Sequence, residues 1–243
     1  MRLLIIRHAD PDYKNDSITE KGWREAQLLS ARLAKESISA FYVSTMGRAR
    51  DTASLTLEKM QAEAAECDWL REFPHRINRP DVTGKRSIPW DWLPEDWTCV
   101  EEYFQKDRWY ETPVMQEGQV KEKYDEVLKE FDRILASHGY VREGGLYRAE
   151  RPNRDTLAFF CHFGLECVLL SHLMDVSPMI LWHHTCASPS SVTSLYTEER
   201  RQGKAIFRMN YFGDVSHLYA GEEPLSFQAR FCETWDDPDE RHD

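Results

Sequence analysis

The sequence has fewer positive than negative charges and lacks a long apolar run. Its 243 residues include 31 Lys and Arg against 42 Asp and Glu, giving a formal net charge of -11. An acidic surface repels polyanions, so we expect neither nucleic acid nor a membrane as a partner. No apolar run reaches the roughly 18 residues of a membrane span, and the apolar start from Leu3 to Ile6 is too short for a signal peptide. A soluble, cytoplasmic protein is expected.

Paired cysteines are also missing. The six cysteines are scattered, with no CxxC pair and no spacing typical of a disulfide framework, so reduced thiols are expected. Cys161, His162, Cys167 and Cys186 follow no usual pattern of zinc ligands. We therefore predict no metal site, and we expect no cofactor.

Short apolar runs alternate with helical periodicity in the first quarter of the chain. Residues 2–6 predict a buried strand, and Thr19 is a predicted cap for a helix that runs toward Lys35. Residues 41–43 predict a second strand, and a second helix is expected from about residue 47 to 65. This order predicts an α/β fold with a mostly parallel central sheet, arranged as a three-layer α/β/α sandwich.

The segment from about 74 to 117 interrupts this regularity. It contains five prolines and four of the eight tryptophans, without sustained periodicity. Linkers are not built from tryptophan, so we predict an inserted cap in a single domain that spans residues 1–243. It is either a satellite core or a lid that contacts the substrate. Basic residues near its start, Arg79 among them, are expected to be solvated, with contact to further anionic groups as the alternative.

Regular patterns return after the insertion. Residues 156–161 are apolar and continuous, as a central parallel strand should be, and His162 follows them directly. The other predicted elements are a helix at about 119–137, a hairpin at 140–148, a helix at 165–174, and strands at 191–196 and 205–209.

Polar residues follow three of the predicted strands. Arg7-His8 follows the first, Ser44 leads into Arg48 after the second, and His162 ends the strand at 156–161. Ligands of open α/β sheets bind beyond the carboxyl ends of the strands, so these side chains are expected to converge. Two arginines and two histidines suit a phosphate, and phosphoryl transfer requires mainly positioning and charge neutralisation.

Several segments, in the same order, resemble the histidine phosphatase superfamily (phosphoglycerate mutase-like, branch 1). The resemblance covers nearly the whole chain outside the insertion. The matching segments are Leu4 to Ala9, Ile18 to Gly22, Ser44 to Ala53, Phe160 to Gly164, Ser191 to Thr193 and Asn210 to Leu218.

The resemblance implies a role for each matching residue. His8 would attack phosphorus and carry a phosphohistidine, Arg7 and Arg48 would hold the phosphoryl oxygens, and His162 would stabilise the moving charge. Glu72 resembles the general acid of the family, although the usual continuation after it is missing.

Some residues leave alternatives open. Asp91 is the alternative acid. Arg50 rivals Arg48 but is expected to face solvent or to pair with a carboxylate. Ala9 and Phe163 replace glycines that are usual beside the two histidines of the family.

A metal-independent phosphatase acting on a phosphate monoester of a small metabolite is therefore expected. The alternatives are a phosphoglycerate-type mutase, against which the residues after His8 argue, and a catalytically silent module that binds a phosphorylated ligand.

Overall fold

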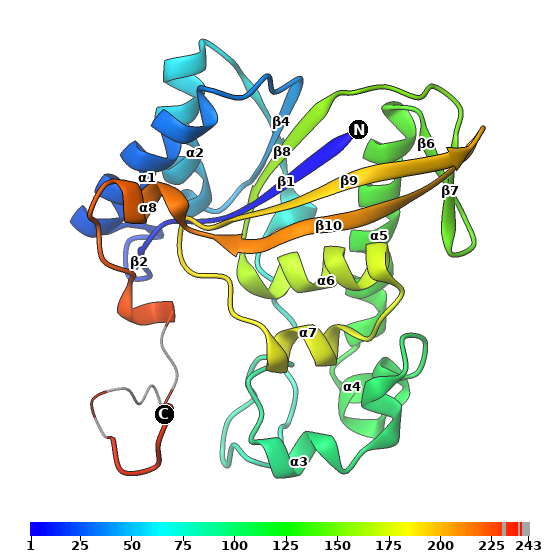
Figure 1. Ribbon diagram of the computed structural model, residues 1–243. Coiled ribbons are helices and arrows are strands. Elements are labelled where there is room, and N and C mark those ends of the chain that lie inside the picture. Colours follow the sequence, from blue (N-terminus) through cyan, green and yellow to red (C-terminus); the bar gives the residue numbers. More distant parts are fainter. Residues whose placement is uncertain (230–231, 238, 240–243) are drawn as a thin grey trace.

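One eight-stranded sheet runs through the centre of the computed structural model, which describes residues 1–229, 232–237 and 239 (Figure 1). The strand order is β5 (Ala64–Cys67), β4 (Ala40–Ser44), β8 (Thr156–Cys161), β1 (Arg2–Arg7), β9 (Val192–Arg201), β10 (Lys204–Asp214), β7 (Leu146–Ala149) and β6 (Tyr140–Glu143). Within the described residues, β9 and β7 run against the other six strands. The predicted mostly parallel sheet is confirmed.

Helices cover both faces of this sheet (Figure 1). One face carries α1 (Glu20–Leu33) and α2 (Gly47–Met60), and the other carries α5 (Val120–Ser137) and α6 (Phe163–Met174). The side chains of β1 alternate between them, since Leu4 and Ile6 pack with α1 and α2, whereas Leu3 and Ile5 belong to the core under α5 and α6. Burial of both faces explains the continuous apolar runs and confirms the α/β/α layers.

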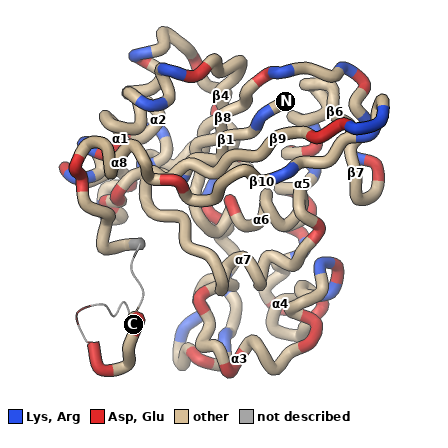
Figure 2. Tube along the Cα trace, in the orientation of Figure 1, with Lys and Arg blue, Asp and Glu red and all other residues tan. Residues whose placement is uncertain are grey.

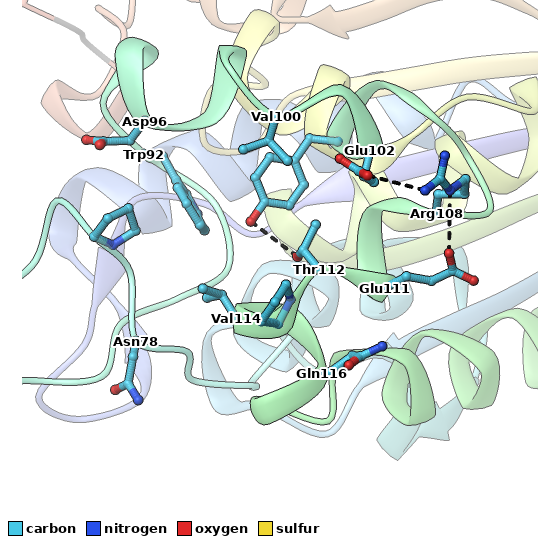
Figure 3. Close-up of a pocket in the computed structure, with 13 residues that line it drawn as sticks. Asn78, Trp92, Asp96, Val100, Glu102, Arg108, Glu111, Thr112, Val114 and Gln116 are labelled. Atoms are coloured by element: carbon cyan, nitrogen blue, oxygen red, sulfur yellow. Dashed lines mark hydrogen bonds and ion pairs between the residues drawn. The ribbon is translucent and has the colours of Figure 1, made fainter.

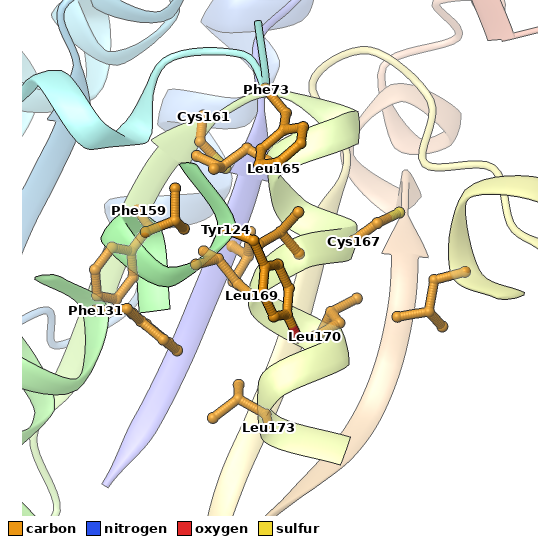
Figure 4. Close-up of a cluster of buried hydrophobic side chains, with 14 of the residues drawn as sticks. Phe73, Tyr124, Phe131, Phe159, Cys161, Leu165, Cys167, Leu169, Leu170 and Leu173 are labelled. Carbon is orange, nitrogen blue, oxygen red and sulfur yellow. The ribbon is translucent and has the colours of Figure 1, made fainter. Parts of the chain in front are cut away.

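The larger core lies between α5, α6 and the sheet. Figure 4 shows Phe131 and Tyr124 facing Phe159, Leu165 and Leu169 across this space. α6 is apolar almost all round because it also packs against α7 (Pro178–His184), and helices buried on all sides lose the usual amphipathic stripe. Outside the segment 74–117, the remaining short elements are β2 (Pro11–Asp12), β3 (Ser17–Ile18), η1 (Asp68–Leu70), α8 (Ser216–Ala220) and η4 (Phe227–Ala229).

Several predicted boundaries were correct and others were wrong. The side chain of Thr19 caps α1 by accepting the Gly22 amide, and β8 spans the predicted residues. The helix predicted to reach residue 65 ends at Met60, because Gln61 adopts a left-handed conformation with φ 51° and the chain then forms the edge strand β5. β9 and β10 are longer than predicted, and α7 was missed.

The segment 74–117 folds into short helices beyond α7, at the end of the molecule away from β4 (Figure 1). They are α3 (Pro94–Thr98), η2 (Glu101–Phe104), η3 (Trp109–Glu111) and α4 (Pro113–Glu117). Its four tryptophans are buried, and Trp90 and Trp109 both pack against Trp182 of α7, with ring centroids 5.5 and 5.4 Å away. The segment therefore extends the main core rather than forming a separate one.

The segment also surrounds a cavity of about 640 Å³ (Figure 3). Trp92, Val100 and Val114 line it, and the Thr112 hydroxyl donates to the Tyr103 hydroxyl oxygen at 3.3 Å on its wall. The strand-end histidines and arginines do not line this cavity. The volume of this cavity therefore does not indicate where the candidate catalytic residues lie.

Candidate active site

The site lies where β1 and β8 end side by side. The two strands pair in parallel with Arg7 opposite Cys161, so Arg7-His8 and His162 leave the sheet at the same edge. The His8 amide donates to the Cys161 carbonyl oxygen at 2.9 Å, and the ring centroids of His8 and His162 are 5.2 Å apart. The strand pattern correctly predicted that the two histidines meet.

His8 is held as a neutral imidazole with a defined tautomer. Its Nδ1 lies 2.8 Å from the Ala9 carbonyl oxygen, which can only accept, so Nδ1 carries the hydrogen and Nε2 keeps a lone pair. The side chain is buried, and burial, followed by the charges of Arg7 and Arg48, holds the pKa of His8 well below its ordinary value. Neutral Nε2 has the electronic state that a nucleophile requires.

His162 is fixed from a third strand. Its Nε2 lies 2.8 Å from the Ser44 hydroxyl oxygen at the end of β4, and this hydroxyl also accepts the Met46 amide. The imidazole is fully buried, and its Nδ1 has no hydrogen-bond partner among the described residues. Burial and the neighbouring His8 and arginines lower the pKa of His162 as well. One nitrogen thus forms a hydrogen bond within the fold, whereas the buried Nδ1 keeps unused hydrogen-bonding capacity.

The two arginines approach this histidine pair from different elements. Arg7 donates through Nη1 to the Ala187 carbonyl oxygen at 2.5 Å, with its Cζ 5.8 Å from the centre of the Phe163 ring. Arg48, in the first turn of α2, donates through Nη1 to Asp16 Oδ1 at 2.8 Å. Each buried guanidinium keeps an Nε without a partner among the described residues. The fork geometry leaves donors for a tetrahedral anion.

Positive charge is a local feature of this site. Figure 2 shows Lys and Arg interleaved with Asp and Glu along the described chain. The start of α6 is at His162, its N-cap, and α2 starts one residue before Arg48, so two helix N-termini also face the strand ends. A small anion is favoured here even though the protein as a whole is acidic.

Glu72 lies at the N-terminus of α6. Its Oε1 accepts the amides of Phe73 and Leu165 at 2.9 and 3.1 Å, and its Oε2 accepts the Gly164 amide at 3.4 Å. Burial raises the pKa of this carboxyl, while the amides and the two arginines, Arg48 and Arg7, oppose the rise. A carboxyl with a raised pKa beside two arginines is suited to proton transfer.

Asp91 also lies close to this region. It lines a small cavity of about 130 Å³ with Arg7, Phe163 and Trp182, and its backbone is left-handed, with φ 64°. The structure thus brings both candidate acids near the arginines, Glu72 from the side of α6 and Asp91 from the insertion.

Two other basic residues, Arg50 and Arg79, form contacts within the fold. Arg50 is half exposed and lies 3.8 Å from Glu66, as predicted for a residue outside the site. Arg79, expected to be solvated, is buried instead: it pairs with Asp81 and donates to the carbonyl oxygens of Trp90 and Asp91. The expectation failed because the loop it supports needs donors for its buried carbonyls.

Some residues of the site were not identified from the sequence. Asp16 holds Arg48, and Tyr13 places its ring 5.5 Å from the Arg48 Cζ atom, yet neither lies in a regular pattern. Ser44 was seen only as the end of a strand. Glu166, one turn beyond His162 on α6, is 1% exposed and interacts with the Thr193 side chain and the Arg7 guanidinium. A carboxylate inside an otherwise apolar helix is the signal that could have singled it out.

Glu166→Gln is expected to change how stability depends on pH. Burial raises the pKa of Glu166 from an ordinary 4.5 to about 7, so the folded protein keeps this proton where the unfolded chain releases it. The stabilisation by that proton is complete below pH 4.5 and is lost as pH rises to about 7, a change of roughly 3 kcal/mol.

Chemical denaturation across this range would measure the effect. His8 and His162, with lowered pKa values, act in the opposite direction, so the informative quantity is the difference between the natural protein and the variant. Parallel curves for the two proteins would contradict a buried, titrating Glu166.

The described residues contain neither a metal-binding cluster nor a membrane-spanning helix. In residues 1–229, 232–237 and 239, no group of three or more His, Cys, Asp and Glu side chains is arranged to hold a metal ion. None of the six cysteines, all of them in this described part, forms a disulfide. Among the same residues, no helix has both the length and the apolar character needed to span a membrane.

Comparisons with known proteins agree with this geometry. The model of the histidine phosphatase superfamily (branch 1) matches residues 3–211. No curated protein matches the chain. Similar solved structures include YhfR of Bacillus stearothermophilus, with 22% identity, a TM-score of 0.55 and coverage of 89% of this chain and 98% of that one.

Two further structures carry phosphatase names. A mycobacterial glucosyl-3-phosphoglycerate phosphatase complexed with VO3 has 21% identity and a TM-score of 0.53, covering 87% of this chain and 98% of that one. A phosphoserine phosphatase from Entamoeba histolytica, in complex with 3-phosphoglyceric acid, has 16% identity and a TM-score of 0.55, covering 89% and 98%. At these identities the likeness establishes a common fold.

Proposed function

Because the chain belongs to the histidine phosphatase superfamily (branch 1), we propose that it hydrolyses a phosphate monoester of a small metabolite through a phosphohistidine on His8. The observation that carries this proposal is the state of His8, a buried neutral imidazole with its Nε2 lone pair beside His162 and two arginines. The phosphatase names of proteins that share the fold support hydrolysis of a phosphate ester.

In the first step, Nε2 of His8 attacks phosphorus and the bond from phosphorus to the ester oxygen breaks. The leaving oxygen takes a proton from the carboxyl of Glu72, with Asp91 as the alternative donor. Arg7, Arg48 and Nδ1 of His162 hold the phosphoryl oxygens, whose charge they neutralise without a metal ion.

In the second step, water attacks the phosphohistidine. The carboxylate formed in the first step removes a proton from this water, the bond from phosphorus to Nε2 breaks, and inorganic phosphate leaves. The carboxyl is protonated again and His8 is neutral, so the cycle closes without a further reactant.

In our proposal, the segment 74–117 forms a wall beside the pocket that holds the phosphoryl group. Trp90 and Asp91 line the small cavity at Arg7, which supports a role for this segment as a cap that contacts the part of the substrate beyond phosphate. A cap of this kind selects substrates, and Asp91 within it is the alternative proton donor to the leaving group.

Release of inorganic phosphate from phenyl phosphate, inhibited by vanadate, would test the proposed hydrolysis. Quenching in alkaline detergent during turnover should trap label from a ³²P-ester on His8, because a phosphohistidine is stable to alkali and hydrolyses in acid. Transfer of label between phosphoglycerates without phosphate release would identify a mutase instead. Binding of vanadate without turnover of any ester would identify a silent phospho-ligand module.

Arg48→Lys is expected to weaken inhibition by inorganic phosphate roughly ten- to a hundredfold, because lysine lacks the planar fork that binds two oxygens. The measurement is the inhibition constant for phosphate. Arg50→Lys is the matched control, since Arg50 is half exposed on the same helix and should leave the constant unchanged. Equal losses in both variants would refute the assignment of Arg48.

A further inference from the structure

A buried carboxylate lies behind the peptide group that fixes the tautomer of His8. The carbonyl oxygen of Ala9 accepts the His8 Nδ1–H, with 2.8 Å between nitrogen and oxygen. The amide N–H of the same peptide group, which belongs to Asp10, donates to Glu25 Oε2 at 2.9 Å. A continuous chain of hydrogen bonds therefore runs from the His8 ring through one peptide group to Glu25.

Close packing of α1 brings Glu25 to this peptide group. Gly22 and Glu25 are three residues apart on α1, so they share one face of the helix. A β-carbon at Gly22 would lie 2.5 Å from the Asp10 carbonyl oxygen, so only glycine allows the helix to come this near. The Thr19 amide donates to the same oxygen at 3.0 Å. The helix thus places the fully buried side chain of Glu25 against the Asp10 amide.

The preceding peptide group is held by α2. The Ala9 amide donates to Thr52 Oγ1 at 2.9 Å, and the Thr52 hydroxyl donates to the Arg48 carbonyl oxygen at 2.7 Å. Ala9 and Thr52 are fully buried. Because the peptide groups on both sides of Ala9 are bonded to helices, the Ala9 carbonyl oxygen is held toward the His8 ring.

An ionised Glu25 makes the Ala9 carbonyl oxygen a stronger acceptor. A carboxylate that accepts the amide N–H polarises the peptide group, which increases the negative charge on its carbonyl oxygen. When Nε2 of His8 takes the phosphoryl group, the ring becomes positively charged while Nδ1 keeps its hydrogen. A stronger acceptor at Nδ1 stabilises this charge, as the buried carboxylate of a Ser-His-Asp triad stabilises its imidazolium, here across one peptide group.

We propose that Glu25 is a positioning residue that acts on His8 through the peptide group between Ala9 and Asp10, and that its negative charge favours formation of the phosphohistidine. This inference rests on the proposed phosphatase function. Glu25 acts from α1 without contacting the phosphoryl group, so its influence depends on whether its carboxyl is ionised.

Several charged groups act on the ionisation of Glu25. Burial, the largest cause, raises the pKa of Glu25 to about 7, and the Asp10 carboxylate adds to the rise. The Asp10 amide opposes it, as does Lys21, whose Nζ lies 3.5 Å from Glu25 Oε1. Lys21 also pairs with Glu223 at 2.8 Å, and Glu223 pairs with Arg24 at the same distance. Glu25 therefore changes its charge near neutral pH.

The first test is Glu25→Gln, which keeps an oxygen for the Asp10 amide but cannot ionise. The ratio of kcat/KM for phenyl phosphate in the variant to that in the natural protein should be close to one at about pH 5.5. It should fall roughly three- to thirtyfold by about pH 8.5, where only the natural protein carries the charge. Taking the ratio cancels the titration of the ester and of groups common to both proteins.

The matched control is Glu20→Gln, which removes an exposed carboxylate from the first turn of the same helix. Its ratio should stay close to one at every pH. A ratio for Glu25→Gln that does not change with pH, or an equal fall in both variants, would overturn the inference and leave the phosphatase proposal intact.

The hydrogen on Nδ1 of His8 provides a second test that does not depend on turnover. Its NMR signal, in protein labelled with ¹⁵N-histidine, should move downfield as pH rises through about 7, and should not move in Glu25→Gln. Lys21→Gln should shift the midpoint to higher pH, because Lys21 lowers the pKa of Glu25. Lys21 is partly exposed, so this variant remains informative if Glu25→Gln does not fold.

An identical titration in Glu25→Gln, or an unchanged midpoint in Lys21→Gln, would overturn the link between Glu25 and His8. The expected NMR titration in a protein that hydrolyses no ester would overturn the phosphatase proposal and leave this link in place. The two failures are therefore distinguishable.

Discussion

His8→Ala is expected to lower kcat/KM for every phosphate monoester by a factor of roughly ten thousand or more. The reason is specific to this site: Nε2 of His8 is the lone pair that accepts the phosphoryl group, and the neighbouring His162 has its own Nε2 bound to Ser44. Steady-state phosphate release would measure the loss, and quenching in alkaline detergent, which preserves phosphohistidine, should trap no labelled protein. Added imidazole should restore part of the turnover by filling the space left by the ring.

His172→Ala is the matched control for this result. His172 is also a buried histidine, but its Nε2 is 2.9 Å from Asp132, in the core rather than at the strand ends. Its loss should lower thermal stability and leave the turnover of the folded fraction close to normal. Near-natural turnover in a folded His8→Ala protein would show that another residue is the nucleophile.

Glu72→Gln is expected to slow alkyl phosphates by a factor of roughly 100 to 10,000, and to slow p-nitrophenyl phosphate far less. An alkoxide is a strong base that cannot leave without a proton, whereas a nitrophenolate can. Because burial raises the pKa of Glu72, activity on alkyl esters should decline as pH rises through that pKa, and the variant should lose this decline.

Asp91→Asn is the comparison that separates the two candidate acids. Glu72 interacts with Arg48 and Arg7. Asp91 lines the same small cavity as Arg7. Equal slowing of alkyl and nitrophenyl esters by Glu72→Gln would exclude it as the acid. If Asp91→Asn instead slows alkyl esters more than nitrophenyl esters, Asp91 is the general acid.

The sequence predicted the strands best where neighbouring residues form a clear apolar pattern. Residues 2–6 and 156–161 are apolar throughout because both faces of a central parallel strand are buried, and a charged or polar residue marks the end of each. Parallel pairing then brings Arg7-His8 and His162 to one edge. Their convergence follows from topology, so it could be predicted without coordinates.

Residues that reach the site from outside these strands could not be predicted in the same way. Asp16 holds Arg48 from a short turn with φ 48°, and Ser44 acts through a side chain whose direction the strand alone does not reveal. The contacts of Ser44 and Glu166 depend on how separate elements pack. Such interactions between elements leave no periodic trace in the sequence.

The insertion shows a partial signal that was overlooked. α3 and α4 both begin with proline, at Pro94 and Pro113, a residue favoured in the first turn of a helix. Their brevity hides any apolar period, and their tryptophans pack on Trp182, a residue far away in the sequence. Composition therefore predicted a folded segment but not its shape.

The hydrogen bond between the Trp92 amide and His183 has a consequence for how substrates enter and products leave. It connects the insertion to α7. Arg79 holds the same loop by donating hydrogen bonds to the carbonyl oxygens of Trp90 and Asp91. Because these hydrogen bonds hold the loop at two places, we expect it to keep its position during turnover rather than to open as a lid. We expect the departing alcohol to diffuse out through a passage of constant width, so the rate of turnover reports bond breaking instead of an opening motion.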